Sequence, residues 1–376
     1  RIFGGYHKGL IAALNNDLDA ADEAFQTAIR ELRAPTGRMA HAYGAVLRMK
    51  GDNEGARALY DAAIGVSVGD AMLEAEIAAL EADQPATPLV STSQEGAAEA
   101  LFGLASALSQ GQEAEARLSL FYTRLAEYLH PGLADAALLS AEILEGQKQY
   151  GLAVKAYESI KSDSPLSRSA EIGRAEALYR LEENDKAVEA LTTLARREPD
   201  AVDVHLALGD LMRRLERFSE GAVAYDRSIK LMAAQGRENW VLFYERGICY
   251  ERSGQWDLAI ADFRKSLELE PDQPLVLNYL GYSWLDRGEN FEEALEMVRK
   301  AVAQRPEDGY IIDSLGWGYY LTGDYENAVL ELERAVEFRP VDPVINDHLG
   351  DALWKVGRQL EAEFQWKRAL SFEPDD

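Results

Sequence analysis

Segments of similar sequence recur along the chain at an interval of about 34 residues. Seven comparable segments follow one another at this interval, with one longer step between the third and the fourth. They begin at Ala134, Arg168, Val202, Trp240, Pro274, Gly309 and Pro343. A period of this length is typical of stacked repeats, in which each unit buries its apolar face on its neighbours. The chain is therefore expected to form an extended array of units and not one closed globule.

Small residues recur at fixed places within each segment. One set of glycines and two sets of alanines do so: Gly281, Gly316 and Gly350; Ala294, Ala328 and Ala362; Ala301, Ala335 and Ala369. Antiparallel helices approach closely only where side chains are this small, and large residues such as Leu332 then fill the space beside them. The pattern predicts an inter-helix core, and no cofactor site, for the large residues Phe263, Trp284, Tyr319 and Trp366.

Glycine and proline mark the helix ends in each segment. A glycine follows the first helix, where a residue that tolerates positive φ lets the chain reverse, at Gly254, Gly288, Gly323 and Gly357. A proline closes the second helix, which it cannot continue, at Pro199, Pro271, Pro306, Pro340 and Pro374. Each unit is therefore predicted to be a hairpin of two helices.

Weaker copies precede this strong array. Two of them start at Ile2 and Gly37, and a helical stretch follows at 71–82. The segment "DQPATPLVSTSQ" at 83–94 lacks helical periodicity and is predicted to be a loop and a hinge. A degenerate unit then covers about 95–132. The predicted organisation is an N-terminal part at 1–83, a linker at 84–94 and a C-terminal array at 95–376.

The period and its small residues resemble those of the tetratricopeptide repeat family over nearly the whole chain. This resemblance implies an all-α, right-handed superhelical solenoid of about ten helix-turn-helix units. It also implies that the first helix of each unit faces a curved inner surface that binds protein partners.

The acidic composition limits the partners. The 39 Lys and Arg against 65 Asp and Glu give a formal charge of −26, which would repel a nucleic acid backbone. No run of about 18 apolar residues is present to span a bilayer. The single cysteine excludes an intrachain disulfide framework and fits either a cytosolic or a periplasmic protein.

No set of catalytic or metal-binding residues is recognisable. The five histidines are scattered without ligand spacing, and no phosphate-binding glycine loop is present. Cys249 lies within a predicted first helix beside Gly247, where a small half-buried residue is expected. We therefore expect neither enzyme activity nor a cofactor or metal.

The family resemblance implies a partner-binding surface on the inward positions of the last first helices. The predicted binding residues are Tyr244, Arg252, Asn278, Tyr282, Asp286, Asp313, Trp317, Tyr320, Asp347, Asp351 and Trp354. Aromatic rings interleaved with Asp and Asn suit a peptide with some basic residues. The alternative is a solvated acidic groove whose aromatic rings pack half against their neighbours.

Several segments also resemble those of bacterial envelope tetratricopeptide lipoproteins, among them "DGYIIDSLGWGYYLTGDYENAV" and "INDHLGDALWKVGR". One member of this group is an adaptor that binds a periplasmic carboxyl-terminal processing protease and presents substrates such as cell-wall hydrolases. The resemblance implies a non-catalytic scaffold with protein partners, located in the periplasm and anchored to the outer membrane by an N-terminal lipid. The alternatives are a cytoplasmic assembly factor or secretion chaperone, and the specificity arm of a larger enzyme.

Both ends of the sequence carry expectations. The chain begins "RIFGGYHKGL", without Met or the profile of a signal peptide, so we expect a fragment whose export or lipid signal lies outside it. The last unit ends without a polar covering helix, which leaves Leu353, Trp366, Leu370 and Phe372 with limited cover. A further segment, a partner or a second copy of the chain, giving a homo-oligomer, is expected to dock there.

Overall fold

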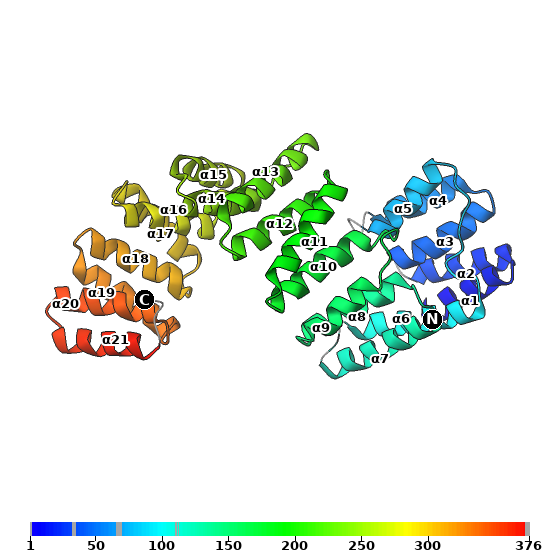
Figure 1. Cartoon of the computed structure of the whole chain (residues 1–376), viewed down its shortest axis with the longest axis horizontal. Helices are drawn as coiled ribbons and strands as arrows, with labels where there is room; N and C mark the ends of the chain where they lie inside the picture. Colours follow the sequence, from blue (N-terminus) through cyan, green and yellow to red (C-terminus); the bar gives the residue numbers. More distant parts are fainter. Residues whose placement is uncertain (1, 32–34, 65–69, 110, 112, 373–376) are drawn as a thin grey trace. The chain divides into compact units, whose positions relative to one another are not determined.

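The computed structural model describes residues 2–31, 35–64, 70–109, 111 and 113–372, which contain 21 α-helices and no strand (Figure 1). The helices are α1 (Ile2–Leu14), α2 (Leu18–Glu31), α3 (Gly37–Met49), α4 (Asn53–Ile64), α5 (Ala71–Glu81), α6 (Ser93–Ser109), α7 (Glu113–Leu129), α8 (Ala134–Gly146), α9 (Tyr150–Glu158), α10 (Ser167–Arg180), α11 (Asn184–Arg197), α12 (Val202–Arg214), α13 (Phe218–Ala234), α14 (Trp240–Arg252), α15 (Trp256–Leu269), α16 (Pro274–Arg287), α17 (Phe291–Gln304), α18 (Gly309–Leu321), α19 (Tyr325–Phe338), α20 (Pro343–Lys355) and α21 (Gln359–Ser371). Ten helix pairs plus the extra helix α5 confirm the predicted all-α repeat architecture.

The chain forms two compact units, residues 1–199 (unit 1) and 200–376 (unit 2). Unit 2 holds α12 to α21, and its first helices α12, α14, α16, α18 and α20 begin at the residues where the sequence repeat begins. The wider spacing between Val202 and Trp240 is explained by α13, which at 17 residues is longer than its equivalents in unit 2.

The helix ends of unit 2 follow the predicted glycine and proline signals. Gly254, Gly288, Gly323 and Gly357 have φ between +70° and +85°, a conformation that side chains disfavour. Four of the five prolines predicted to close a second helix, Pro199, Pro271, Pro306 and Pro340, lie just beyond α11, α15, α17 and α19. The fifth, Pro374, lies outside the described residues. Arg334 and Arg368, which occupy equivalent positions in successive repeats, donate hydrogen bonds to the carbonyl oxygens of Pro306 and Pro340. These bonds tie the second helix to the start of its own hairpin.

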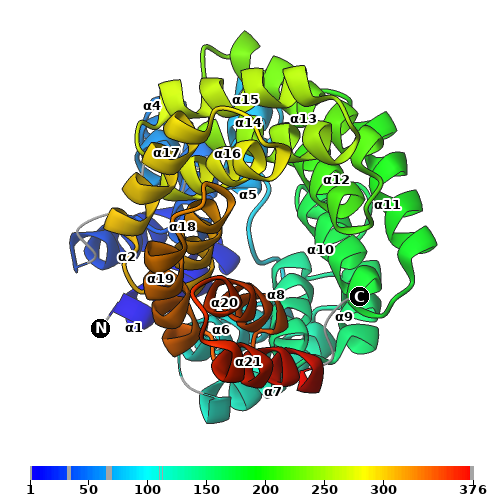
Figure 2. The same ribbon diagram turned by 90° about the vertical axis from the view of Figure 1, so that its left-hand side faces the viewer.

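A glycine in each first helix of unit 2 faces a large side chain of the second helix. An added Cβ at Gly316 would lie 2.6 Å from Cγ of Leu332, and one at Gly350 would lie 2.5 Å from Cδ1 of Trp366. The facing alanines Ala294, Ala328 and Ala362 are fully buried. In Figure 2 the first helices α14, α16, α18 and α20 lie on the inner side of the curve of unit 2, and their partners lie on its outer side.

The predicted core residues of unit 2 differ in burial. Phe263 and Trp284 have no exposed surface, as expected for core residues. Tyr319 and Trp366 are half-buried and pack against the edge of the same cores. Leu353 is only 1 % exposed, so the helices of unit 2 already cover it, whereas Leu370 is 71 % exposed.

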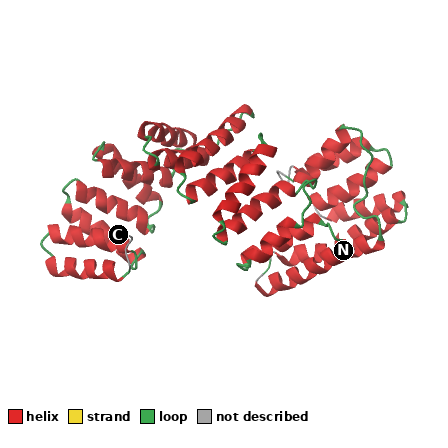
Figure 3. Cartoon of the chain, viewed as in Figure 1, coloured by secondary structure: helices red, strands yellow, loops and turns green. Residues whose placement is uncertain are grey.

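Unit 1 interrupts the simple succession of hairpins. The helix α5 packs on α3 and α4, as the next first helix would, but α6 then lies beside α1 and α8. The chain crosses between α5 and α6 through the loop at 83–92, drawn as a long green segment in Figure 3. The helix α6 therefore begins inside the predicted loop of 83–94, at Ser93.

This loop is packed against the first helices of unit 1. Val90 is 3 % exposed, and Leu89 packs against the same core cluster. The Arg48 side chain donates a 2.6 Å hydrogen bond to the carbonyl oxygen of Gln84. These contacts hold the predicted linker on the core of α1 to α5, and the compact units divide between 199 and 200.

A half-buried arginine of α3 links this helix to α6 and α8. Arg38 of α3 donates to both carboxylate oxygens of Glu99 on α6, at 3.0 and 2.6 Å, and to Asp135 on α8 at 2.7 Å. The Tyr6 hydroxyl of α1 also donates to Glu99, which is 2 % exposed. Burial would raise the pKa of Glu99, but the hydrogen bonds and charge of Arg38 outweigh it and lower this pKa. The buried Glu99 side chain thus remains ionised because of Arg38.

We expect Gly316→Leu to destabilise unit 2 by about 1–3 kcal/mol or more, because the new side chain would overlap Leu332. The matched control is Gly146→Leu, since a Cβ there meets nothing within 4 Å. Thermal unfolding followed by circular dichroism measures both. An unchanged melting temperature for Gly316→Leu would show that the hairpin does not require this close approach.

We expect Arg38→Met to destabilise unit 1 by about 3–5 kcal/mol, because it leaves the Glu99 carboxylate buried without a cation. Arg57→Met is the comparison, since Arg57 pairs with Asp61 and Glu81 at the surface, where such pairs contribute only about 0–1 kcal/mol. Urea unfolding measures the difference. Equal losses of unfolding free energy in the two variants would contradict the role given to Arg38.

Candidate functional site

A cleft of about 430 Å³ lies on the inner face of unit 2. Its walls come from α14, α16, α18 and α20, the first helices of four successive hairpins. It is lined by Glu251, Arg252, Asn278, Tyr279, Tyr282, Ser283, Asp286, Arg287, Tyr310, Asp313, Ser314, Val344 and His348. We call this surface the unit 2 cleft.

The lining follows the repeat. Tyr279, Ser314 and His348 each lie one repeat apart, so they occupy one equivalent position on three successive helices. Asn278 and Asp313 form the neighbouring row. Because the hairpins stack in register, each row brings side chains that are distant in sequence to one surface.

Five of the predicted binding residues are brought together in the unit 2 cleft: Arg252, Asn278, Tyr282, Asp286 and Asp313. Tyr244 is placed differently. Its half-buried ring packs against the core and contacts the rings of Phe263 and Tyr279, with centroids 6.1 and 6.0 Å away. Its main contacts are therefore with the interior of unit 2.

The predicted residues Trp317 and Tyr320 form a stack at the edge of the cleft. The Trp317 ring lies 4.7 Å from Tyr320 and 4.1 Å from the His348 ring, nearly parallel to both. Trp317 and Tyr320 are half-buried. Each ring therefore offers part of its surface while being held by its neighbours.

The three predicted residues of α20 continue toward the end of unit 2. Asp347 is exposed, and Asp351 accepts a 3.2 Å hydrogen bond from the Trp366 indole. Trp354 is 47 % exposed and contacts the Trp366 ring at 5.5 Å. These residues do not line the unit 2 cleft.

An ion pair connects two walls of the cleft. Nδ1 of His348 on α20 donates to the carboxylate of Asp313 on α18 at 3.0 Å, and Asp313 is only 7 % exposed. Burial would lower the pKa of His348, but the hydrogen bond and charge of Asp313 outweigh it. Asp347 and Asp351 act in the same direction, so this pKa lies above its ordinary value.

Asn278 leaves a polar atom without a partner inside the cleft. Its Oδ1 is buried and has no hydrogen-bond partner. Nearby, the Tyr279 hydroxyl donates to Glu251 at 3.1 Å, and burial followed by the charges of Asp286 and Asp313 raises the pKa of Tyr282. A buried amide oxygen is normally hydrogen-bonded, so Asn278 carries an acceptor whose bonding is unmet in this structure.

The cations of the cleft are held against aromatic rings. The Arg252 guanidinium lies 4.9 Å from the Phe218 ring centroid, and that of Arg287 lies 4.7 Å from the Trp256 ring centroid. No ion pair among the described residues involves Asp286. The cleft thus presents a carboxylate that an incoming cation can approach.

The buried setting of Cys249 opposes ionisation of its thiol. Burial raises the pKa of the Cys249 thiol to about 12, far from that of a nucleophilic cysteine. No three His, Cys, Asp or Glu side chains in the described ranges lie where they could hold a metal ion. None of the described helices is both long and apolar enough to cross a membrane.

The sequence-based list missed part of the cleft, above all His348. Its position follows from the repeat, because it stands directly after the predicted row of Asn278, Asp313 and Asp347. The same offset gives Tyr279 and Ser314. A search of the positions flanking each predicted row could therefore have found these residues.

Comparison with known proteins gives the family. Models described as tetratricopeptide repeat match residues 172–236, 240–273 and 287–343. The chain belongs to the tetratricopeptide repeat family. The matched residues include α14 and α18 of the unit 2 cleft, together with the last residue of α16 and the first residue of α20.

Curated tetratricopeptide relatives match part of the chain. A TPR repeat-containing protein of Pseudomonas aeruginosa is 28 % identical over 196 residues, covering 52 % of this chain and 32 % of that protein. Human tetratricopeptide repeat protein 13 is 27 % identical over 187 residues, covering 48 % of this chain and 21 % of that protein. The chain thus spans about a third or less of the length of these relatives.

Among solved structures, the APC/C hetero-tetramer Cut9–Hcn1 matches with 14 % identity and a TM-score of 0.47, covering 98 % of this chain and 93 % of that chain.

Tetratricopeptide repeats generally act as protein-interaction scaffolds. This chain is accordingly a repeat scaffold for protein–protein interaction.

The stability of unit 2 should depend on pH through His348. Because the folded pKa is raised, the protonated histidine contributes stability that is fully present below its unfolded pKa of about 6.5 and is lost as pH rises through the folded pKa. The difference in unfolding free energy between the protein and its His348→Gln variant should therefore shrink as the pH rises through the folded pKa of His348.

Urea unfolding at pH 6 and pH 9, with NMR titration of the imidazole, measures this effect. Asp313→Asn should remove most of the pKa shift, whereas His130→Gln in unit 1 should leave the pH dependence of unit 2 unchanged. A His348 titration at or below the ordinary histidine value would contradict the assignment.

Proposed function

We propose that the unit 2 cleft binds an extended peptide segment of a partner protein. The observation that carries this proposal is the unpaired, buried Oδ1 of Asn278 in a cleft walled by tyrosines and carboxylates. An extended peptide presents backbone N–H groups that a helical peptide keeps for itself. Once the Asn278 side chain turns its amide oxygen toward the cleft, one such group would bond to it and remove the cost of an unsatisfied buried acceptor.

The remaining lining favours a peptide that has both apolar and basic side chains. The rings of Tyr282 and Tyr310 offer apolar surface, and Tyr310 is 52 % exposed. Asp286 is available to a lysine or arginine of the peptide, because Arg252 and Arg287 lie against the rings of Phe218 and Trp256. Binding should therefore weaken as salt increases.

For the biological role, we propose an adaptor in the bacterial envelope. In this role the chain binds a periplasmic carboxyl-terminal processing protease and presents its protein substrates, and a lipid on an N-terminal segment outside this sequence anchors it to the outer membrane. The support is the resemblance of segments such as residues 308–329 to envelope tetratricopeptide lipoproteins. A tetratricopeptide relative in Pseudomonas aeruginosa is consistent with a bacterial setting.

The adaptor role is tested by affinity purification of the intact gene product from its own cells, followed by fractionation. We expect to recover a carboxyl-terminal processing protease. We also expect the pure adaptor to stimulate cleavage of co-purified hydrolases by this protease. Recovery of cytosolic proteins alone would instead favour the assembly-factor or secretion-chaperone alternative.

We expect Asn278→Ala to weaken binding of a peptide from a co-purified partner about tenfold, since one hydrogen bond to a buried group contributes on the order of 1–1.5 kcal/mol. The double variant Tyr282→Ala and Trp317→Ala should weaken it further while helicity is retained. Asn184→Ala, at the exposed start of α11, is the matched control. Isothermal titration calorimetry measures the loss of affinity, and circular dichroism measures any loss of folded structure. If the double variant loses both together, the rings of Tyr282 and Trp317 belong to the core.

A further inference from the structure

Two adjoining clefts lie on unit 1 and share Phe102 and Ser106. Their volumes are about 340 and 430 Å³. We call their combined surface the unit 1 groove. Its main apolar side chains are Phe3, Met39, Met72, Phe102, Leu138 and Leu166.

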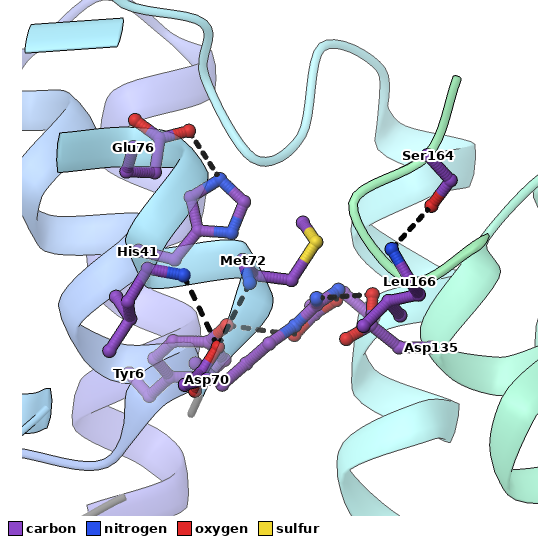
Figure 4. Close-up of polar contacts among 11 residues, drawn as sticks. Tyr6, His41, Asp70, Met72, Glu76, Asp135, Ser164 and Leu166 are labelled. Atoms are coloured by element: carbon purple, nitrogen blue, oxygen red, sulfur yellow. Dashed lines mark hydrogen bonds and ion pairs between the residues drawn. The ribbon is translucent and has the colours of Figure 1, made fainter. Parts of the chain in front are cut away.

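The groove exists because α6 packs beside α1 and α8 instead of following α5. Its apolar side chains therefore come from α1, α3, α5, α6, α8 and the residue before α10. Figure 4 shows Asp70 and Met72 at the start of α5 on one side, and Asp135 and Leu166 on the other. Phe3 is 52 % exposed, and Phe102, Leu138 and Leu166 are half-buried. Apolar surface is thus open to a ligand along the groove.

The charge of the groove is negative. Four carboxylates line it, those of Asp70, Glu99, Asp135 and Glu142, against the single guanidinium of Arg38, which gives a formal charge of −3. Each nitrogen of Arg38 already donates to Glu99 or Asp135.

Glu142 is the carboxylate best placed to meet a ligand. It is exposed on α8, and none of the ion pairs among the described residues involves it. Partial desolvation and the charge of Glu145 raise its pKa. A nearby cation would relieve this unfavourable environment.

The hydrogen-bonding groups of the groove distinguish a helical ligand from an extended one. Since Arg38 and the Tyr6 hydroxyl already donate to carboxylates, the remaining side-chain donors that line the groove are the hydroxyls of Thr36, Ser106 and Ser169. An extended peptide would leave many of its carbonyl groups without partners here. A helix pairs its own backbone groups and presents a stripe of apolar side chains.

From this combination, we propose that the unit 1 groove binds an amphipathic α-helix of a partner protein. The apolar stripe of the helix lies on Phe102, Leu138 and Leu166, and a lysine or arginine at the edge of the stripe pairs with Glu142. This site is separate from the unit 2 cleft in residues and in chemistry, because the cleft offers an unpaired amide and hydroxyls to an extended segment.

The test uses a labelled synthetic helix of about five turns with leucines at i, i+3, i+4 and i+7 and lysines beside them, measured with the whole chain by fluorescence anisotropy. A second peptide replaces each lysine by glutamate. We expect the lysine peptide to bind at least about tenfold more tightly, with an advantage that falls as salt increases.

Variants of the groove locate the binding. Phe102→Ala should weaken binding of the lysine peptide about tenfold, through loss of aromatic contact area, whereas Phe121→Ala on α7 should not. Ser106→Trp keeps the core intact and should block the groove, because Ser106 is exposed where the two clefts meet. Glu142→Gln should weaken binding about two- to fivefold and flatten its salt dependence, with Glu54→Gln on α4 as the control.

Four results would overturn the inference. The first is equal binding of the two peptides, and the second is unchanged binding by both Phe102→Ala and Ser106→Trp. The third is a concentration-dependent dimer in sedimentation that Ser106→Trp abolishes, which would identify a second copy of the chain as the occupant. Loss of binding on Asn278→Ala alone would place the peptide in the unit 2 cleft and also contradict it, so the two proposals fail separately.

Discussion

The close approach of a glycine in one helix to a large side chain in the next is the contact on which the hairpins depend. An added Cβ would lie under 3.0 Å from the large side chain in seven pairs: Gly9 with Phe25, Gly44 with Tyr60, Gly209 with Tyr225, Gly247 with Phe263, Gly281 with Val298, Gly316 with Leu332 and Gly350 with Trp366. The partner follows its glycine at the same separation in every pair except that of Gly281, where it stands one position further along. This spacing fixes both the turn length and the rotation of the two helices about their axes, because a ring can enter only where the opposing helix has no side chain.

Close packing also determines where the binding chemistry can lie. When glycine and alanine occupy one side of a first helix, the opposite side lies away from the partner helix and can carry polar residues. The row of Tyr279, Ser314 and His348 illustrates this freedom, since the fold accepts an aromatic ring, a hydroxyl and an imidazole at one repeat position. The unit 2 cleft can therefore differ in chemistry from hairpin to hairpin while the scaffold stays the same.

The helices were predictable from the sequence because their signals are local, as the positive φ of turn glycines such as Gly323 shows. Helix periodicity and the sequence repeat together also placed Asn278 and Asp313 on one surface. The position of α6 was not predictable in this way, because the repeat specifies which neighbour follows and carries no signal for a change of neighbour. The contacts of Arg38 with α6 and α8 lie outside any repeat period. The packing of Tyr244 into the core was not predictable either, because the size of the neighbouring rings decides how much of a side chain remains exposed.

The contacts of their arginines explain why both surfaces present negative charge to a partner. In the unit 2 cleft, Arg252 and Arg287 lie against aromatic rings, and in the unit 1 groove Arg38 is surrounded by carboxylates and lies 5.2 Å from the ring centroid of Phe102. A cation held in this way contributes to packing while its charge is partly compensated. Carboxylates without a described ion pair, such as Asp286 and Glu142, then dominate the local potential. The net charge of −26 acts in the same direction, so both surfaces present a negative potential to a partner.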